Sequence, residues 1–291
     1  MNVKEKYNDF NKKMPHQIAT IDGQEFQYRY YDNPNSDVTI IFLAGGSGLG
    51  DGGFMLYDSF LEKYSLMCFN YPLAFKTNKE LADALAKLIN ELGLTNVYLV
   101  GQSYGGLFAQ VMAKEYPSVI KGLILLGTCS MSNDLTYEGI HNITKFINPK
   151  KLKRNLMIDR LIPGKFFIPL MKLAFWKHAP DKKMARMLSD IVDVLKVSIT
   201  SEFWCHMDML LGDLMNEFGR HKPSNFMKYD NEVLLFFSEE DKIFCDDLKG
   251  ALIRLMPENT KITNLVGGHL SLFVDFEGYC NEIFEFLDAR N

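Results

Sequence analysis

Apolar residues follow two alternating patterns along the chain. Short runs rich in Val, Ile, Leu and Phe, with few polar interruptions, predict strands that are buried on both faces. Runs in which apolar residues recur every three or four positions predict helices packed against a sheet. The predicted strands are 25–31, 38–43, 66–70, 96–100, 119–126, 233–237 and 261–266. The predicted helices are 54–63, 80–92, 107–113, 248–256 and 279–287.

This alternation predicts an α/β fold with a mostly parallel, twisted sheet and helices on both of its faces. One long interruption, residues 131–228, lacks β-branched runs and indicates several helices separated by prolines. We therefore expect a core domain formed by residues 1–130 and 229–291, with an inserted helical cap formed by residues 131–228. Because the insertion follows a strand, the cap would lie above the carboxyl edge of the sheet, where open α/β sheets bind their ligands.

The insertion is strongly basic. Between 145 and 188 there are 12 Lys and Arg residues against only Asp159 and Asp181, a net charge of +10. Because the whole chain has a net charge of −4, the remaining residues together carry −14. Such a segment can bind an anionic substrate or rest on an acidic membrane, but a solvated outer face is the favoured interpretation. We expect its large apolar residues to pack on the body of the protein or to line an acyl pocket. These residues are Phe166, Phe167, Met171, Phe175 and Trp176.

Composition excludes several classes of protein. A chain of 291 residues that is 47% hydrophobic can bury a large core, and its net charge of −4 gives no reason to expect nucleic acid. No signal peptide is expected from the polar first residues, and the longest apolar stretch, 161–176, is too interrupted to cross a membrane. The five cysteines have no C-x-x-C spacing, so we expect neither a disulfide framework nor a metal site, and a cytoplasmic location. No feature indicates the oligomeric state.

The segment Gly101-Gln102-Ser103-Tyr104-Gly105 stands between a predicted strand and a predicted helix. A G-x-S-x-G sequence in that position is the nucleophile elbow, a tight turn that raises a serine hydroxyl above the sheet. Glycines are needed there because the turn is strained and two backbones approach closely. An ordinary serine in a turn is the alternative, and the flanking strand and helix favour the nucleophile.

An activated serine needs a base to accept its proton and a further group to orient that base. Gly267-Gly268-His269 follows one predicted strand and presents an imidazole, and the acidic turn 238–243 follows another. Both turns follow strand ends, as Ser103 does, so we expect them at the same edge of the sheet. We favour Asp241 as the acid of this set. Glu239, Glu240 and Asp134 remain alternatives.

The ordered set of serine, acid and histidine resembles the α/β-hydrolase superfamily over nearly all of the chain outside the cap. The resemblance implies a Ser103–His269–Asp241 triad in which Ser103 is the nucleophile. The acid turn matches the family's G-x-x-D-x-[IV] pattern with Ser238 in place of the usual glycine, and the histidine turn matches its G-G-H pattern. In this family, epoxide and haloalkane hydrolases use Asp at the elbow, so the serine argues against those reactions.

The resemblance also implies an oxyanion hole in the glycine loop 44–48, and we expect the backbone N–H groups of Gly46 and Tyr104 to be its donors. Ala44 stands where the family often has a histidine. The neighbouring segment 48–53 matches the dinucleotide pattern G-x-G-x-x-G, but it starts five residues past its strand, and the next strand ends in Asn70 instead of an acidic residue. We interpret it as a mobile loop beside the oxyanion hole.

These features predict a cofactor-free serine hydrolase that cleaves a small, mainly apolar carboxylic ester or related acyl compound through an acyl-enzyme at Ser103. The same machinery would serve a proline-iminopeptidase-like peptidase, a thioesterase or a C–C bond hydrolase. A non-catalytic small-molecule receptor on the same fold is the alternative from another class. Because the predicted triad is complete, we favour the enzyme.

Overall fold

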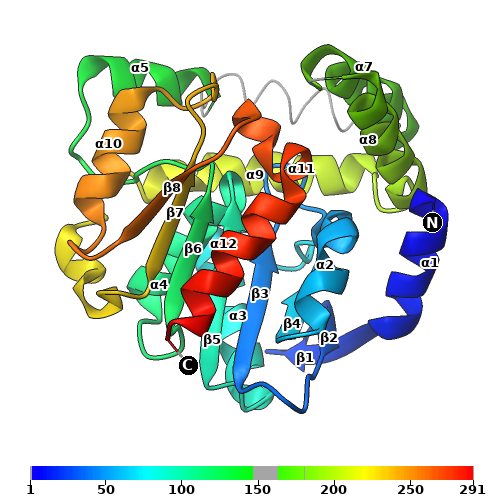
Figure 1. Ribbon diagram of the computed structural model, residues 1–291, viewed down its shortest axis with the longest axis horizontal. Coiled ribbons are helices and arrows are strands. Elements are labelled where there is room, and N and C mark those ends of the chain that lie inside the picture. Colours follow the sequence, from blue (N-terminus) through cyan, green and yellow to red (C-terminus); the bar gives the residue numbers. More distant parts are fainter. Residues whose placement is uncertain (1, 147–162, 180, 291) are drawn as a thin grey trace.

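The computed structural model describes residues 2–146, 163–179 and 181–290, and its centre is one eight-stranded sheet (Figure 1). The strand order is β1-β2-β4-β3-β5-β6-β7-β8. Strands β4 to β8 in this order run parallel, whereas β2 pairs antiparallel with both β1 and β4. The strands are β1 (His16–Ile21), β2 (Gln24–Tyr31), β3 (Val38–Leu43), β4 (Ser65–Cys68), β5 (Asn96–Gln102), β6 (Gly122–Leu126), β7 (Val233–Phe237) and β8 (Lys261–Asn264).

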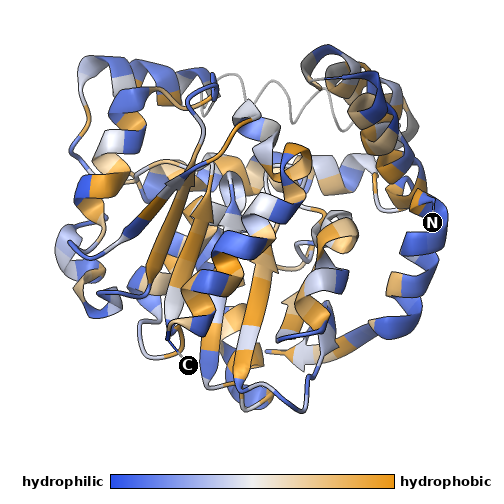
Figure 2. Cartoon of the chain, in the orientation of Figure 1, coloured by the Kyte–Doolittle hydropathy of each residue, from blue (hydrophilic) through white to orange (hydrophobic). Residues whose placement is uncertain are grey.

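Helices cover both faces of the sheet. Helices α2 and α12 pack together on one face, and α3 and α4 pack together on the other (Figure 1). Every residue of β3, β6 and β7 is buried between these layers, and the central strands are hydrophobic along their length (Figure 2). The predicted fold class is confirmed. The helices of this part are α1 (Val3–Lys13), α2 (Phe54–Leu61), α3 (Asn78–Glu91), α4 (Tyr104–Glu115), α10 (Asp246–Leu255), α11 (Ser271–Val274) and α12 (Phe276–Asp288).

The regular elements described between β6 and β7 are helices joined by turns and loops, and residues 147–162 lie outside the described part. Helix α9 of this segment lies against the glycine loop, because a Cβ on Gly48 would overlap the sulfur of Met207. The α-helices are α5 (Tyr137–Phe146), α7 (Phe167–His178), α8 (Lys182–Leu195) and α9 (Ser201–Asp213). Short 3-10 helices are η1 (Gly50–Gly53), η2 (Gly164–Phe166), η3 (Leu214–Asn216), η4 (Pro223–Asn225), η5 (Met227–Tyr229) and η6 (Gly268–Leu270).

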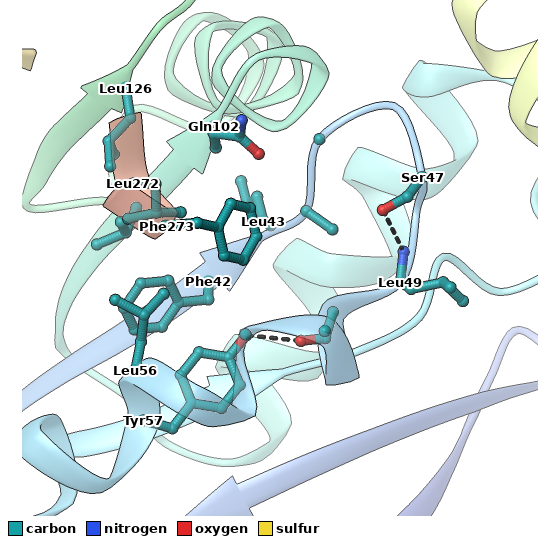
Figure 3. Close-up of a pocket in the computed structure, with 16 residues that line it drawn as sticks. Phe42, Leu43, Ser47, Leu49, Leu56, Tyr57, Gln102, Leu126, Leu272 and Phe273 are labelled. Carbon is teal, nitrogen blue, oxygen red and sulfur yellow. Dashed lines mark hydrogen bonds between the residues drawn. The ribbon is translucent and has the colours of Figure 1, made fainter. Parts of the chain in front are cut away.

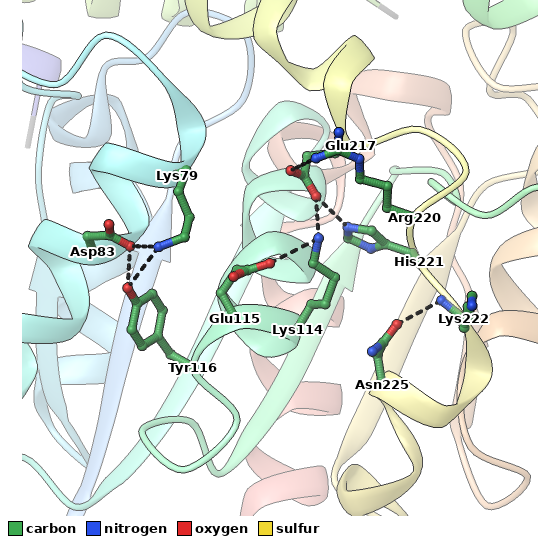
Figure 4. A network of polar contacts seen from close by, with 10 residues as sticks. All are labelled: Lys79, Asp83, Lys114, Glu115, Tyr116, Glu217, Arg220, His221, Lys222 and Asn225. Atoms are coloured by element: carbon green, nitrogen blue, oxygen red, sulfur yellow. Dashed lines mark hydrogen bonds and ion pairs between the residues drawn. The ribbon is translucent and has the colours of Figure 1, made fainter.

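A partly buried ionic network joins this segment to α4 (Figure 4). Lys114 Nζ lies 2.5 Å from Glu217 Oε2, and His221 Nε2 lies 3.4 Å from the same oxygen. The hydrogen bond with His221 and the ammonium of Lys114 outweigh the effect of burial and lower the pKa of Glu217 to about 2. Glu217 is therefore a carboxylate at neutral pH and holds the end of the segment on the core.

The segment 48–53 differs from the mobile loop expected from its glycines. Leu49, Gly50 and Asp51 are buried. Both carboxylate oxygens of Asp51 accept hydrogen bonds from Arg29, at 2.8 and 3.0 Å, and Arg29 is itself only 1% exposed. A buried bidentate ion pair is costly to open, so this loop is held firmly between β2 and α2.

Helix α1 and strand β1 are the elements that the apolar pattern did not predict. Helix α1 is polar on most sides and begins with a capping box between Asn2 and Glu5. Strand β1 is an edge strand whose residues are mostly exposed or half-buried. Neither element buries a continuous apolar run, which is the signal from which the other strands were predicted.

Candidate active site

The elbow serine, Ser103, follows the last residue of β5 and precedes the first residue of α4. Ser103 has φ 52° and ψ −116°, a strained conformation for a residue with a side chain. The turn is held by Ser103 N–H, which donates to Leu126 O at 2.9 Å, and by Thr128 Oγ1, which donates to Ser103 O at 2.8 Å. The turn has no room for a side chain at Gly105, because a Cβ there would overlap the carbonyl oxygen of Leu43. The strained turn thus presents the hydroxyl at the carboxyl edge of the sheet.

The turns after β7 and β8 bring an acid and a base to the same edge. His269 Nε2 lies 3.1 Å from Ser103 Oγ, and His269 Nδ1 lies 3.0 Å from Asp241 Oδ2. The side chain of Asp241 is 3% exposed and that of His269 is 18% exposed. The three side chains predicted from the sequence therefore lie in one hydrogen-bonded line that reaches solvent only at its histidine and serine end.

Burial of Asp241 would raise the pKa of its carboxyl. The hydrogen bond and charge of His269, together with backbone N–H groups of Ile243 and Phe244, outweigh burial and hold this pKa below its ordinary value. Asp241 is therefore ionised wherever an imidazole can act as a base. An ionised acceptor on Nδ1 favours the tautomer with its proton there, which leaves Nε2 free to accept the proton of Ser103.

The other acidic residues considered from the sequence point elsewhere. Asp134 forms an ion pair with Arg254 at an exposed position. Glu239 is exposed, and Glu240 accepts a hydrogen bond from Gly267 N–H at 3.0 Å. Among these acids only Asp241 contacts the imidazole.

Two hydrogen bonds between the acid turn and the histidine turn position the imidazole. One is the bond from Gly267 to Glu240, and in the other Gly268 N–H donates to Ser238 Oγ at 3.0 Å. The second bond explains the serine at a position where a glycine was expected, because glycine offers no hydroxyl acceptor. This role was not predicted, although the pairing of neighbouring parallel strands places the two turns side by side.

Gly127 is a further residue that the sequence did not reveal. It follows β6 with φ +47°, and a Cβ there would lie 3.7 Å from both Asp241 Oδ2 and His269 Nδ1. The ring of Phe244 packs edge-on against His269 with centroids 5.5 Å apart. Both residues limit how the imidazole can tilt. Their signal in the sequence is only that each follows a strand of the sheet.

The two backbone groups predicted as oxyanion donors lie on the two segments that flank Ser103. As the first residue of α4, Tyr104 has an N–H group with no carbonyl one turn earlier in the helix. Gly46 lies inside the turn closed by the hydrogen bond from Gly48 N–H to Gly45 O, which does not use the Gly46 N–H. Tyr71 Oη donates to Ala44 O at 2.8 Å and supports the loop where a histidine was expected.

A small apolar cavity of about 90 Å³ lies beside these residues (Figure 3). Its wall is shared by the glycine loop, the elbow residue Gln102 and the residues that follow the histidine turn, Leu272 and Phe273. The three triad side chains are not part of its lining. The cavity is therefore a neighbouring apolar space and not the point of bond cleavage itself.

In the described part of the chain, no cluster of three or more His, Cys, Asp or Glu residues has the arrangement of a metal centre. None of the described helices combines the length and apolar character needed to cross a bilayer. None of the five cysteines, all of which are described, forms a disulfide bond.

Comparisons with known proteins agree with the fold. The profile of a family described as alpha/beta hydrolase fold matches residues 46–147. A protein of Pantoea ananatis that carries the name carbamate hydrolase RutD is 26% identical, over 38% of this chain and 43% of that protein. A proline iminopeptidase of Lactobacillus delbrueckii subsp. lactis is 27% identical, over 37% of this chain and 42% of that protein. The matched segment thus spans less than half of these relatives.

A crystal structure of a bromoperoxidase from Bacillus anthracis covers 94% of this chain and 99% of its own, with a TM-score of 0.69 at 14% identity. A likeness at that identity concerns the fold alone. The family profile over residues 46–147, the sheet order and the structural similarity together show that the chain has the alpha/beta hydrolase fold.

Proposed function

We propose that this protein is a serine hydrolase that cleaves a small, mainly apolar carboxylic ester or related acyl compound. The observation that carries the proposal is the line of hydrogen-bond distances from Asp241 through His269 to Ser103. Residues 131–228 act as the cap over a core of residues 1–130 and 229–291, and α9 of that cap closes on the glycine loop.

In the first half of the reaction, Ser103 Oγ attacks the carbonyl carbon while His269 Nε2 accepts the hydroxyl proton. The N–H groups of Gly46 and Tyr104 stabilise the oxyanion, aided by the positive N-terminal end of α4. The imidazolium then gives its proton to the leaving alcohol, which leaves the acyl group on Ser103. Asp241 stabilises the transient charge on His269 without taking its proton.

In the second half, His269 removes a proton from water, and the resulting hydroxide attacks the acyl carbon. Collapse of this intermediate releases the carboxylic acid and returns the proton to Ser103. The balanced reaction is ester plus water to acid plus alcohol, and every proton transfer uses one imidazole. The apolar cavity of about 90 Å³ suits a short acyl chain.

Amide and carbamate substrates use the same steps with a poorer leaving group. Relatives named as a carbamate hydrolase and a proline iminopeptidase make these bonds the second candidates. A series of p-nitrophenyl esters of increasing chain length, with anilide, carbamate and thioester counterparts, separates them by kcat/KM. We expect the highest value for a short-chain ester.

A fluorophosphonate probe tests the nucleophile directly. Wild type is expected to be labelled, Ser103→Ala is expected to lose labelling, and Ser118→Ala, which removes an exposed serine on a surface turn, is expected to retain it. Absence of labelling of a folded wild type between about pH 7 and 9 would refute the hydrolase. Equal labelling of Ser103→Ala would assign the reaction to another residue.

A further inference from the structure

Helix α7 exposes a continuous apolar face. Leu170 is 61% exposed, Leu173 is 66% exposed and Trp176 is 46% exposed, and Phe166 just before the helix is 55% exposed. Spacings of four, three and three residues place these side chains on one side of a helix. We call this set, Phe166, Leu170, Leu173 and Trp176, the α7 face. Phe166 and Trp176 are more exposed than the sequence predicted.

The opposite side of α7 is already used by the fold. Phe167, Met171 and Phe175 pack against the core cluster, and the ring of Phe167 lies 5.5 Å from that of Trp204 in α9. The helix is therefore apolar on two sides, only one of which is covered by described residues. Large apolar side chains grouped on one exposed surface are typical of an interaction site.

Basic residues lie at one end of this face. Lys172 Nζ lies 2.6 Å from Asp193 Oδ1, which fixes α7 and α8 as an antiparallel pair. That pairing brings Lys182, Lys183 and Arg186, all exposed, to the same end of the pair as Trp176 and Lys177. Residues 167–195 carry five Lys and Arg residues against Asp181, Asp190 and Asp193, a net charge of +2 in a chain of net charge −4. The exposed basic side chains at this end of the pair therefore favour a negatively charged surface.

We propose that the α7 face is a docking surface for an anionic lipid membrane. Leu, Phe and Trp side chains next to Lys and Arg are the chemistry of a helix that lies in the plane of the interface, its apolar side in the acyl region and its basic rim at the headgroups. Trp and Tyr prefer that boundary. Helix α7 has only 12 residues, too few to span a bilayer, so it binds along the surface.

An anionic membrane accounts for both the apolar side chains and the basic residues of this surface. Nucleic acid or a free phosphate would use the lysines but would leave four apolar side chains in water. A neutral apolar partner would leave the charge unused. Docking through α7 is independent of the proposed hydrolase.

Vesicle binding tests the proposal with the full chain. One set of vesicles contains phosphatidylcholine alone, and in the other about one third of the lipid is phosphatidylglycerol. We expect binding to the anionic set, weakened by salt, and weaker binding to the neutral set. Leu170→Glu/Leu173→Glu is expected to lower the partition coefficient about tenfold or more. Ile18→Glu/Ile253→Glu makes the same charge change at two exposed positions on β1 and α10 and is expected to bind like wild type.

Fluorescence locates the contact, because the chain has only two tryptophans. In Trp204→Phe, emission from Trp176 is expected to shift to shorter wavelength on addition of anionic vesicles. In Trp176→Phe, emission from Trp204 is expected to remain unchanged. Near-ultraviolet circular dichroism checks that each variant is folded.

Three results would overturn the proposal: no binding to anionic vesicles, equal binding of the Leu170→Glu/Leu173→Glu variant, or concentration-dependent self-association that this variant abolishes. The last result would identify a second copy as the occupant. Ser103→Ala is expected to bind vesicles like wild type, so failure of the hydrolase and failure of docking are distinguished.

Discussion

Asp241 holds His269 by a 3.0 Å contact at Nδ1, although 28 residues separate them in the sequence. This contact fixes the tautomer that allows Nε2 to act as a base. In Asp241→Asn the amide can donate to Nδ1 and stabilise the wrong tautomer, so kcat is expected to fall by about 10⁴-fold with little change in KM. Steady-state kinetics on the best p-nitrophenyl ester measures the effect.

Asp134→Asn is the matched control for that substitution. Asp134 also follows a strand of the sheet, but it pairs with Arg254 on the surface. Its kcat is expected to stay within about twofold of wild type, because exposed ion pairs contribute little. If Asp134→Asn and Asp241→Asn lost activity equally, the assignment of the acid would be wrong.

Substitutions at two nearby glycines test whether a position lacks room for a side chain or contributes only its backbone N–H group. A Cβ on Gly105 would overlap the carbonyl oxygen of Leu43, whereas a Cβ on Gly46 would meet no atom within 4 Å. Gly105→Ala is therefore expected to lower stability by about 1–3 kcal/mol and to abolish probe labelling, because β3 and α4 must separate.

Gly46→Ala keeps its N–H group and should change stability by less than about 0.5 kcal/mol, with labelling preserved. Thermal melts and fluorophosphonate labelling of both variants check these expectations. Equal melting temperatures for Gly105→Ala and wild type would show that the elbow has more room than the structure allows.

The sequence predicted those parts of the fold and site that depend on local pattern. Ser103, Asp241 and His269 each follow a buried apolar strand, and parallel strands carry their following turns to one edge. Contacts made by side chains between distant segments were not predictable in this way. The pairing of Arg29 with Asp51 needs the register of β2 against the glycine loop, and the bond from Gly268 to Ser238 needs the two final turns side by side.

The α7 face shows a different limit. Apolar side chains at helical spacing predict burial, and about half of those in α7 are half-buried against the core cluster. Residues such as Leu173 repeat the same spacing on the other side of the helix and are exposed. Periodicity indicates that two sides are apolar, but only the packing of the neighbouring helices shows which side remains outside.

Arg29→Met is expected to destabilise the protein strongly. The substitution leaves the carboxylate of Asp51 without its partner at a position only 2% exposed, and breaking one side of a buried ion pair costs about 3–5 kcal/mol. Chemical denaturation measures the loss. Lys13→Met, which breaks the exposed pair of Lys13 with Asp58, should cost less than about 1 kcal/mol.

The double variant Arg29→Met/Asp51→Leu distinguishes the loss of the ion-pair attraction from the cost of burying an unpaired carboxylate. Removing both charges is expected to recover most of the stability, because the penalty arises mainly from the unpaired carboxylate. If the double variant were as unstable as Arg29→Met, packing of the arginine on Phe10, whose ring centroid lies 4.6 Å from its guanidinium carbon, would be the larger contribution.

The ionic network around Glu217 predicts how the free energy of unfolding depends on pH. The pKa of Glu217 is lowered to about 2 in the folded protein, first by its hydrogen bond with His221 and then by Lys114. An unfolded glutamate has a pKa of about 4.3. As pH falls from about 5 to 2, the unfolded chain takes up a proton that the folded chain does not, so stability from this group is complete above that window and is lost within it.

Glu217→Gln removes this linkage. We expect the variant to be less stable than wild type by on the order of 2 kcal/mol near pH 6, and the difference to shrink as pH falls toward 3. Burial lowers the pKa of His221, and its hydrogen bond with Glu217 opposes this effect. Glu217→Gln therefore also lowers the pKa of His221 further, so the comparison reports the Glu217–His221 pair and not Glu217 alone. Urea denaturation at both pH values measures the two free energies of unfolding, and Glu91→Gln, at the exposed end of α3, controls for the change in net charge. A difference that stays constant with pH would mean that Glu217 stabilises the fold by packing and not by its charge.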